Sequence, residues 1–408
     1  MNEGVLVLGA DYRGLGVVQS LGRLGIPVVV LHEGPRNLAN YSRYVWRAIR
    51  WPAGDEASRT AFLIDLAARE RLRRWMIVPT QDETAAMCAR NAVDLCSAFR
   101  VSVPPWEVLR WAYDKRLSHQ LAADIGVEFA NTWEPTRDEF NSIEFEYPVI
   151  IKPAVKSSVN ALTIAKAWRV DEPESLSKRL DEASSLMPLD ELLVQELIPG
   201  NGKNQLSFAA LASEGQPIAT MVAQRTRQYP MDFGRASTFV ETVDEPAIEE
   251  LGGRLIKAMD YTGLIEIEFK RDPRTNVLKL LDMNARVWGW HTLGRRAGTD
   301  FSVLLWRLVH GDTPAPVRAR VGVSWMWPAA DIPTAAREIF GRRLGLREYA
   351  RNFRRPTDYA TLVLDDPLPG LLEVPLHLAG ALQRRRATQE VLRRKPDGAR
   401  SFQSPEEA

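Results

Sequence analysis

Four polar side chains interrupt the two apolar runs of LIEIEFKRDPRTNVLKLLDMNAR, a stretch that begins at Leu264. Glu266 and Glu268 lie in the first run, and Asp282 and Asn284 lie in the second. Between the runs, RDPRTN carries an Asp-Pro turn starter followed by polar residues, which predicts a hairpin loop between two strands. A buried carboxylate without a partner costs several kcal/mol, so each acid of this hairpin needs a compensating group.

Strand geometry decides which of these side chains meet. Successive side chains of a strand point to opposite faces, so Asp282 shares a face with Asn284 while Leu281 points the other way. A hairpin that folds about Thr275 places Glu268 directly opposite Asp282. Cross-strand neighbours lie about 5 Å apart, where two negative charges repel each other.

Two interpretations of this hairpin remain open at this point. A shared hard cation would remove the repulsion, and carboxylate and amide oxygens are the ligands that Mg²⁺ prefers. Alternatively, the polar face of the hairpin is solvated, and Lys270 and Arg286 on the same face neutralise its acids.

The composition is that of an ordinary globular protein of two or three domains, with 408 residues, 45% hydrophobic and 26% charged. The formal net charge of +1 does not indicate a nucleic-acid partner. Cys88 and Cys96 form no redox or metal motif, and the scattered histidines predict no zinc site. We expect a cytoplasmic protein without a membrane span, because the sequence has neither a signal-peptide pattern nor an apolar run of roughly 20 residues.

The N-terminal stretch predicts an α/β domain over residues 1–100. VLVLGADYRGLGVVQS followed by PVVVL reads as a strand, a helix and a second strand, which is a βαβ unit. Gly9, Gly14 and Gly16 do not have GxGxxG spacing, so the pattern favours tight strand-to-helix packing over a dinucleotide site.

Two lysines of the next block have a context that suits phosphate binding. Lys115 lies in a predicted helix, and Lys152 ends the predicted strand PVIIK. A lysine at a strand end, with its stem packed and its ammonium accessible, provides a point charge for phosphate. Either lysine alone would more often be a surface charge.

The chain from about residue 312 has a weaker pattern and is rich in Arg and Pro. Its end, QRRRATQEVLRRKPDGARSFQSPEEA, predicts a frayed helix and a disordered basic and polar tail. The clusters QRRR and LRRK could contact acidic lipid or nucleic acid, but a solvated helix face is the interpretation that the composition favours.

These motifs, in this order, resemble the ATP-grasp family from residue 1 to about residue 310. The resemblance is strongest to bacterial carboxylate–amine ligases, in KAWRVD, RQYPMDFGRAS and LLDMNARVWGWH. It implies a mixed α/β and α+β fold. A Rossmann-like preATP-grasp domain (1–100) is followed by an ATP-grasp domain (101–311) with lobes of about 101–194 and 195–311, and by a C-terminal extension (312–408).

The resemblance also implies site residues. Those expected to bind the nucleotide are Lys115 and Lys152 at the phosphates, Gln195, Glu196 and Ile198 in the hinge at the adenine, and Gln205 at the ribose. Those expected to hold the metal are Glu268, Asp282 and Asn284. Arg286 and Lys152 are the expected catalytic residues.

The sequence departs from the family in the loop after Lys152. The loop, AVKSSVNALTIAKAW, has no glycine, so Lys156 with its neighbouring serines would have to supply the phosphate donors. Gln205 replaces the usual ribose-binding acid, and Asp282 replaces the commoner glutamate.

Five further side chains have two interpretations each. Arg225, Arg227 and Arg235 could clamp the triphosphate or a substrate carboxylate, or they could belong to a solvated loop. Trp288 and Trp290 could line the acceptor pocket or pack in the core.

The function that the resemblance implies is ATP-dependent ligation of a carboxylate to an amine through an acyl phosphate. ATP and Mg²⁺, with Mn²⁺ as an alternative, would be the cofactors. The partners would be small-molecule acids and amines, with amino acids among them, and the chain could form a homodimer. A nucleotide-binding regulatory or scaffold protein without turnover is the alternative.

Overall fold

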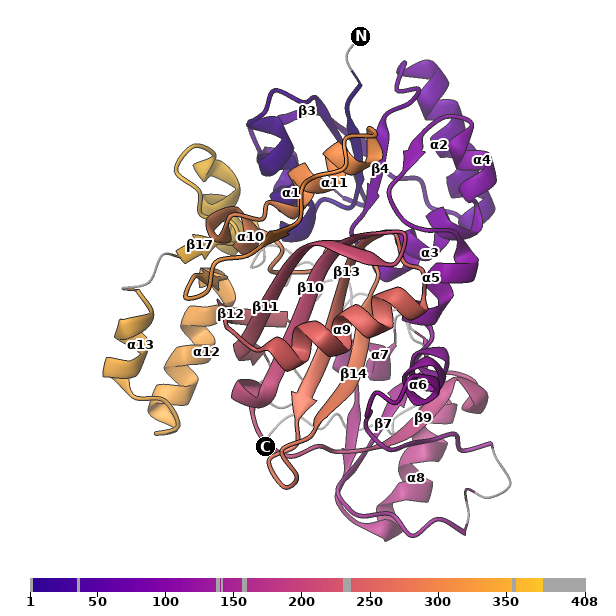
Figure 1. Ribbon diagram of the computed structural model, residues 1–408, viewed down its shortest axis with the longest axis vertical. Coiled ribbons are helices and arrows are strands. Elements are labelled where there is room, and N and C mark those ends of the chain that lie inside the picture. Colours follow the sequence, from indigo (N-terminus) through magenta and orange to yellow (C-terminus); the bar gives the residue numbers. More distant parts are fainter. Residues whose placement is uncertain are drawn as a thin grey trace, which may run out of the picture.

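The computed structural model describes residues 3–34, 37–136, 140, 142–155, 160–229, 236–353 and 357–376. The described residues form a five-stranded parallel sheet, a four-stranded antiparallel sheet and an eight-stranded mixed sheet, which we call the first, small and central sheets. Figure 1 shows the central sheet between the domain of the first sheet and the lobe of the small sheet. This arrangement confirms the predicted α/β and α+β fold.

The first domain is built on short, continuously apolar strands, which suit a parallel sheet that is covered on both faces. Its strands pair in the order β3-β2-β1-β4-β5 and are β1 (Val5–Leu8), β2 (Val28–His32), β3 (Val45–Arg50), β4 (Met76–Pro79) and β5 (Arg100–Val101). Its helices are α1 (Tyr12–Gly22), α2 (Glu56–Arg69), α3 (Asp82–Arg90) and α4 (Ala92–Cys96), with a 3₁₀ turn η1 (Leu38–Tyr41).

Two glycines allow the first strand and helix to pack closely. A Cβ at Gly14 would lie 2.1 Å from the Gly9 carbonyl oxygen. A Cβ at Gly9, whose φ is +123°, would lie 2.2 Å from Thr80 Oγ1. These contacts support the packing interpretation of the glycines.

The small lobe follows α5 (Trp106–Tyr113) and α6 (Lys115–Asp124). Its strands pair in the order β6-β9-β7-β8 and are β6 (Thr132–Trp133), β7 (Val149–Pro153), β8 (Trp168–Val170) and β9 (Leu192–Glu196). The remaining elements are α7 (Ala161–Ala165), α8 (Pro173–Ser184) and the 3₁₀ turns η3 (Leu189–Glu191) and η4 (Gly202–Asn204).

The central sheet has the strand order β14-β13-β10-β11-β12-β16-β17, and β15 pairs with β11. The strands are β10 (Gln205–Ser213), β11 (Gln216–Tyr229), β12 (Ala236–Thr242), β13 (Gly263–Arg271), β14 (Leu278–Asn284), β15 (Val317–Arg318), β16 (Ser324–Met326) and β17 (Thr357–Tyr359). The helices are α9 (Pro246–Ala258), α10 (Leu293–Ala297), α11 (Phe301–Val309), α12 (Pro328–Phe340) and α13 (Leu346–Asn352).

Alternation along these strands gives the central sheet two different faces. One face is apolar, with Phe208 and Ile267 packed against Ile248 of α9, which Figure 1 shows lying across the sheet. The opposite face is apolar only toward the first domain, where Leu211 packs with Trp288. Beyond that core, the same face carries polar side chains, and this is where the candidate site lies.

The segment that we expected as a C-terminal extension contributes strands to the central sheet. Strand β16 pairs with β12, and β17 pairs with β16 in parallel. These strands are too short to show a periodic pattern, which is why the sequence did not reveal them. Residues 377–408, which include the predicted frayed helix and disordered tail from Gln383 onward, lie outside the described residues. No helix in the described ranges is both long and apolar enough to cross a membrane.

A buried carboxylate fastens the C-terminal segment to the first domain. Asp366 Oδ2 accepts hydrogen bonds from Gln19 Nε2 at 3.0 Å and from Ser42 Oγ at 2.6 Å. Its Oδ1 accepts from the backbone amide of Arg43 at 3.0 Å. The adjacent Asp365 binds Arg23 and Tyr44, but its side chain is 42% exposed.

These two neighbouring acids predict unequal losses of stability. Asp366→Ala should lower the free energy of unfolding by about 3 kcal/mol, because Gln19 and Ser42 would stay buried without their acceptor. Asp365→Ala is the matched control and should cost about 1 kcal/mol, because water replaces part of its contacts. Thermal and urea unfolding measure both values, and equal losses would contradict the anchoring role of Asp366.

Candidate active site

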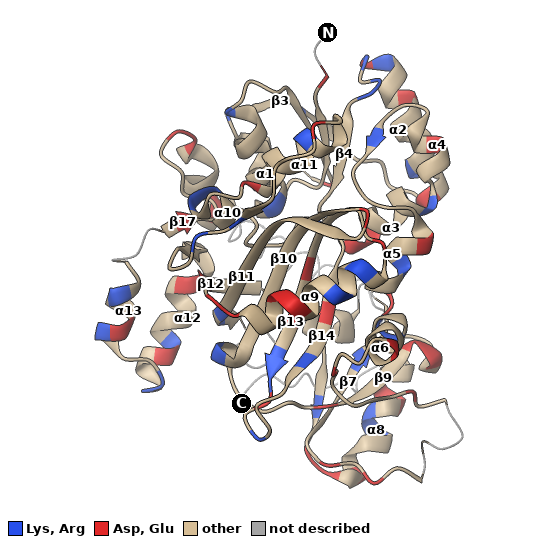
Figure 2. Cartoon of the chain, viewed as in Figure 1, with Lys and Arg blue, Asp and Glu red and all other residues tan. Residues whose placement is uncertain are grey.

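A cavity of about 150 Å³ lies between the small lobe and the polar face of the central sheet. The predicted site residues that line it are Lys115, Lys152, Gln195, Glu196, Ile198, Gln205, Glu268 and Asp282. Figure 2 shows charged residues of both signs on β13 and β14, the strands that form its floor. Pockets for drug-sized ligands measure roughly 300–1,000 Å³, so a nucleotide would require the two lobes to move apart.

Lys152 enters this cavity from strand β7. Its side chain is buried, and Nζ donates a hydrogen bond of 2.8 Å to Gln195 Oε1. Gln195 Nε2 in turn donates to Thr132 Oγ1 at 2.7 Å, which fixes the amide. Burial, and after it the neighbouring positive charge of Lys115, lowers the pKa of Lys152 to about 7 against the attraction of Asp282.

Lys115 connects the start of α6 to the hairpin. Its Nζ lies 3.0 Å from Asp282 Oδ1, and both side chains are largely buried. Its backbone amide donates to the Ala154 carbonyl at 3.2 Å, just beyond the end of β7. The two predicted phosphate-binding lysines, Lys115 and Lys152, therefore line the same cavity, next to the backbone contact between α6 and the end of β7.

The hairpin has the predicted pairing, with Glu268 opposite Asp282 and Glu266 opposite Asn284. A β-bulge produces this register, because Phe269 pairs with Leu280 and leaves Leu281 as the extra residue of β14. Without the bulge, Glu268 would lie opposite Leu281.

The expected orientation of Leu281 was wrong for the same reason. Leu278 and Leu280 pack in the same core as Met283, so the alternation shifts by one residue between them. Leu281 therefore lines the cavity beside Asp282 instead of pointing away from it.

The acids of the hairpin are compensated by cations from other strands. Glu268 Oε2 accepts hydrogen bonds from Arg225 and from Gln205 Nε2, the latter at 2.9 Å, and Oε1 accepts from Asn284 Nδ2 at 3.1 Å. Arg225 is itself buried and donates to Ser237 Oγ at 2.7 Å. Glu268 is only 8% exposed, so the alternative of a solvated hairpin face was wrong.

Arg286 links the hairpin to the first domain. Its Nε donates to Asp82 Oδ1 at 2.9 Å, and its Nη2 donates to Asn284 Oδ1 at 2.8 Å. Asp82 is the first residue of α3, directly after the carboxyl end of β4. The predicted catalytic arginine therefore lies where the first domain meets the predicted metal ligands.

Glu266 is a site residue to which the sequence assigned no role. It is 3% exposed, and Oε2 accepts a weak hydrogen bond of 3.3 Å from Asn284 Nδ2. Within the described residues, its Oε1 has no hydrogen bond of good geometry. Burial, and after it the adjacent negative charge of Glu268, raises the pKa of Glu266 to about 7. The alternation of EIEF had already placed it on the polar face.

The oxygen donors of the hairpin fit a hard cation such as Mg²⁺. Glu268 and Asp282 are cross-strand neighbours, Asn284 contacts Glu268, and Glu266 adds a buried oxygen without a good partner. No three His, Cys, Asp or Glu side chains are arranged as a metal site in the described part of the chain. Because Asp282 Oδ1 is paired with Lys115 Nζ, a cation bound by Asp282 would have to replace that lysine.

Residues of the hinge at the end of β9 line the cavity, together with other residues that the sequence did not predict. Glu196 is held by Lys279 Nζ at 2.5 Å, and the Ile198 carbonyl accepts from Lys270 Nζ at 2.7 Å. The lining residues that were not predicted are Thr163, Lys166, Gln228, Lys270 and Leu281. Of these, Lys166 lies in KAWRVD, which had carried part of the family resemblance.

Not every predicted nucleotide-binding residue lies in the cavity. Arg227 forms a buried bidentate ion pair with Asp331 of α12, at 2.9 Å for both contacts, and lies over the Phe239 ring. This pairing favours a structural role for Arg227. Lys156 and Arg235 lie outside the described residues. Trp288 and Trp290 are buried in the core, in agreement with the packing interpretation.

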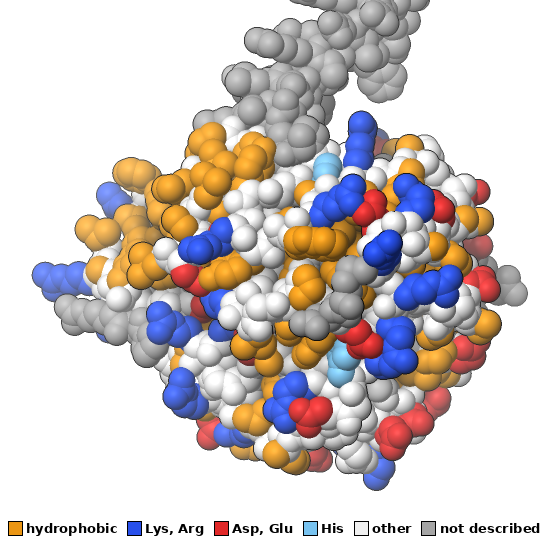
Figure 3. Space-filling view, turned by 90° about the horizontal axis from the view of Figure 1, so that it is seen from above, with side chains coloured by type: hydrophobic (Ala, Val, Ile, Leu, Met, Phe, Trp, Pro, Cys, Tyr) orange, Lys and Arg blue, Asp and Glu red, His pale blue; other side chains and the backbone are white. Residues whose placement is uncertain are grey.

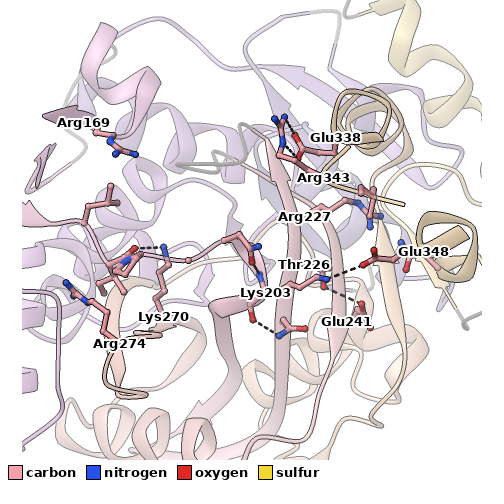
Figure 4. Close-up of a pocket in the computed structure, with 18 of the residues that line it drawn as sticks. Arg169, Lys203, Thr226, Arg227, Glu241, Lys270, Arg274, Glu338, Arg343 and Glu348 are labelled. Carbon is pink, nitrogen blue, oxygen red and sulfur yellow. Dashed lines mark hydrogen bonds and ion pairs between the residues drawn. The ribbon is translucent and has the colours of Figure 1, made fainter. Parts of the chain in front are cut away.

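A larger hollow of about 1,080 Å³ adjoins the hinge (Figure 4). It shares Ile198 and Lys270 with the smaller cavity, whereas α12 and α13 supply its far wall. Ion pairs neutralise parts of that wall, as between Lys203 and Glu348 at 3.1 Å. Lys152, Glu268 and Asp282 line the smaller cavity instead, which is therefore the candidate centre of chemistry.

The chain is distantly similar to a curated protein. A D-aspartate ligase of Enterococcus faecium is 21% identical over 232 residues, which are 53% of this chain and 54% of that protein. The chain thus spans about half the length of the curated relative that it matches. No protein-family model matches the chain.

Solved structures match a larger share of the chain. An L-amino acid ligase from Bacillus licheniformis matches with a TM-score of 0.59 at 13% identity, over 76% of this chain and 74% of that one. The biotin carboxylase domain of a 2-oxoglutarate carboxylase from Hydrogenobacter thermophilus, solved with MgADP and bicarbonate, matches with a TM-score of 0.61 at 17% identity, over 79% and 74%. At identities this low the likeness establishes the fold alone, and the chain has the ATP-grasp fold that its motifs resembled.

Proposed function

We propose that this chain is an ATP-dependent carboxylate–amine ligase that forms an amide or peptide bond through an acyl phosphate and releases ADP and phosphate. The observation that carries the proposal is the cavity in which Lys115 and Lys152 meet Glu268 and Asp282 within an ATP-grasp fold. The names of the D-aspartate ligase and the L-amino acid ligase support this class of reaction, with amino acids as the first substrates to test.

The nucleotide would extend from the hinge to the hairpin. Gln195, Glu196 and Ile198 would bind the adenine, Gln205 the ribose, and Lys115 and Lys152 the phosphates. Glu268, Asp282 and Asn284 would hold Mg²⁺, whose charge, when the ion is bound, neutralises phosphate oxygens. Glu266 would add to the negative field at this end of the site.

The residues of the chain would act mainly by charge and position. The substrate carboxylate would attack the γ-phosphate, and Lys152 and Arg286 would stabilise the charge on the transferring phosphoryl group. The amine would then attack the acyl phosphate and displace phosphate. Closure of the lobes would keep water from the acyl phosphate during this second step.

Nucleotide binding would replace ion pairs between side chains of the cavity with contacts to the nucleotide and its cation. Lys115 would leave Asp282 for a phosphate, and Asp282 would accept the cation. Because each partner is replaced by another of the same sign, no charge would be left buried and uncompensated. The exchange would also release the contact between α6 and the hairpin, and so allow the small lobe to open.

A nucleotide-binding protein without turnover is the second candidate. The observation in its favour is that both acids are already neutralised, Asp282 by Lys115 and Glu268 by Arg225, which suits a stable closed state. Formation of ADP separates the two functions.

A matrix of carboxylic acids and amines, with amino acids first, should contain a pair that releases ADP and phosphate from MgATP. Hydroxylamine in place of the amine should trap the activated acid as a hydroxamate, because it attacks an acyl phosphate directly. AMP and pyrophosphate as products would contradict the proposed route. Tight MgATP binding without ADP for any pair would favour the second candidate.

Lys152→Met should lower kcat/KM for ADP formation more than about a hundredfold, because loss of the charge on the phosphoryl group costs about 3 kcal/mol. Methionine keeps the apolar stem and removes a desolvated charge, so the melting temperature should stay equal or rise. Lys203→Met, which removes an exposed lysine, is the control and should keep full activity. Activity of Lys152→Met within a few-fold of the unaltered enzyme would refute the phosphate role.

Nucleotide binding should also be coupled to proton uptake at Lys152. Its pKa of about 7 leaves it mostly neutral at pH 8 in the unliganded protein, and an adjacent triphosphate would raise that pKa. Calorimetry in buffers of different ionisation enthalpy should therefore detect uptake approaching one proton at pH 8 and little at pH 6. The same uptake in Lys152→Met would show that another group titrates.

Asp282→Asn should raise the Mg²⁺ concentration for half-maximal activity at least about tenfold, because a charged ligand is lost. Without nucleotide it should cost about 1 kcal/mol of stability, through loss of the contact with Lys115. Asp358→Asn removes a comparable ion pair with Arg295, at 3.0 Å and away from the cavity, and should leave the Mg²⁺ requirement unchanged. An unchanged Mg²⁺ requirement in Asp282→Asn would place the metal elsewhere.

A further inference from the structure

A separate cavity, which we call the α6 cavity, lies between α6 and the small sheet. It measures about 320 Å³, which is within the size range of sites for small molecules. Its walls come from α6, from β6 and β9, and from residues on either side of β6. In the described part of the chain, no residue lines both this cavity and the candidate active site.

The walls of the α6 cavity restrict what can bind there more than the open surface does. Exposed apolar side chains gather on the left of the molecule in Figure 3, but an open surface sets no limit on the size or charge of a partner. The α6 cavity is lined from α6 on one side and from the small lobe on the other. Its occupant can therefore be inferred from the residues of both walls.

Aromatic rings line much of the α6 cavity. Among the described residues they are His119, Phe129, Trp133 and Phe140. The rings of His119 and Phe129 are stacked, with centroids 4.9 Å apart and an angle of 11° between their planes. Trp133 and Phe140 are both held by the ring of Phe145, at centroid distances of 5.0 and 5.4 Å. Such walls offer flat apolar surfaces against which another aromatic ring can pack.

His119 is a buried polar side chain without a hydrogen bond. The residue is 7% exposed and lines the α6 cavity. In the described part of the chain, neither ring nitrogen of His119 has a hydrogen-bond partner. Because an unpaired polar group in the interior is unfavourable, a ligand that pairs with this ring would gain binding free energy.

The charges near His119 keep its ring neutral. Burial, and after it the positive charges of Lys152 and Lys115, lowers the pKa of His119 to about 3 against the attraction of Asp282. A neutral imidazole has one donor and one acceptor nitrogen, either of which a hydroxyl group can complement. The same two lysines disfavour a cationic ligand beside the ring.

The walls of the α6 cavity do not favour an anion either. Arg116 is the basic residue among the described lining residues, and it is already paired with Asp114 Oδ2 at 2.6 Å and with the Asp190 carbonyl at 2.9 Å. Glu134 lines the same cavity and would repel a carboxylate. An uncharged ligand therefore fits these walls best.

We propose that the α6 cavity binds a small uncharged aromatic molecule that carries a hydroxyl group, with its rings against Phe129, Trp133 and Phe140 and its hydroxyl at His119. The binding itself does not depend on the proposed ligase activity, because the α6 cavity is separate from the candidate active site.

The position of the α6 cavity gives its occupant a regulatory role, which rests on the proposed function. Thr132 lines the α6 cavity, and its Oγ1 accepts a hydrogen bond from Gln195, the amide that holds Lys152. An occupant that fits these walls would stabilise the arrangement in which Gln195 holds Lys152. A nucleotide would replace that contact, so the occupant and the nucleotide should weaken each other's binding.

Titration with 2-naphthol, a two-ring phenol that is uncharged at pH 7, tests the binding directly. Calorimetry of the full chain without nucleotide should give a single site with a dissociation constant below about 1 mM. The anion 2-naphthoate, which has the same rings, should bind at least about tenfold more weakly. Equal binding of the two compounds, or no binding of 2-naphthol, would overturn the proposal.

Matched variants locate the site. His119→Phe keeps a ring beside Phe129 but removes the nitrogens, so the affinity for 2-naphthol should fall at least about tenfold while the melting temperature stays equal or rises. Ala123→Trp places a large side chain at an exposed position of α6 that lines the cavity, and should abolish binding. His310→Phe is the control, because His310 also contacts an aromatic ring, that of Trp306, but does not line the α6 cavity. Unchanged affinity in either cavity variant, or an equal loss in the control, would overturn the proposal.

The regulatory role has its own measurement. Saturating 2-naphthol should raise the dissociation constant of MgADP at least about threefold, and His119→Phe should remove this effect. The same MgADP affinity with and without 2-naphthol would overturn the regulatory role. A chain that binds 2-naphthol but never MgADP would contradict the proposed function, and the regulatory role with it, and would leave the aromatic site established.

Discussion

The buried ion pair between Glu268 and Arg225 is the interaction on which the site depends. Glu268 lies on the polar face of a sheet whose other face is a dense apolar core, so its charge cannot reach bulk water. A buried charge is tolerated only when it is paired and hydrogen-bonded. Arg225, Gln205 and Asn284 meet this requirement from three different strands, and their positions thereby fix where the cavity can be.

The same requirement explains why the cavity is small in the unliganded chain. Lys115 and Asp282 neutralise each other across the gap between α6 and the hairpin, and Lys152 rests on an uncharged amide with a lowered pKa. A triphosphate with its cation carries charges of both signs and can replace both partners at once. A neutral ligand could not replace the ion pair between Lys115 and Asp282, so the site selects for a ligand that carries charges of both signs.

Strand alternation was sufficient to predict the polar face of the hairpin and the pairing of Glu268 with Asp282, whereas the one-residue bulge at Leu281 was not predictable. The bulge arises from packing of Leu280 and Met283 in one core, which is a tertiary constraint. The pairing of Arg227 with Asp331 could also not be predicted, because Asp331 lies 104 residues after Arg227 in the sequence. The roles of the cavity residues in binding remain predictions from the family resemblance and the geometry.

Composition could not decide whether the QRRR and LRRK clusters belong to a solvated helix face or contact acidic lipid or nucleic acid, and these residues lie outside the described part of the chain, so both interpretations stay predictions. What the structure does show is how the last described segment is held, because the buried carboxylates of Asp366 and Glu373 both accept hydrogen bonds from the body of the protein. Asp366 bonds to Gln19 of α1, and Gln19 also accepts from Arg295 of α10 at 3.3 Å. The last described segment is therefore attached to the first domain, whose Asp82 holds Arg286 at the site.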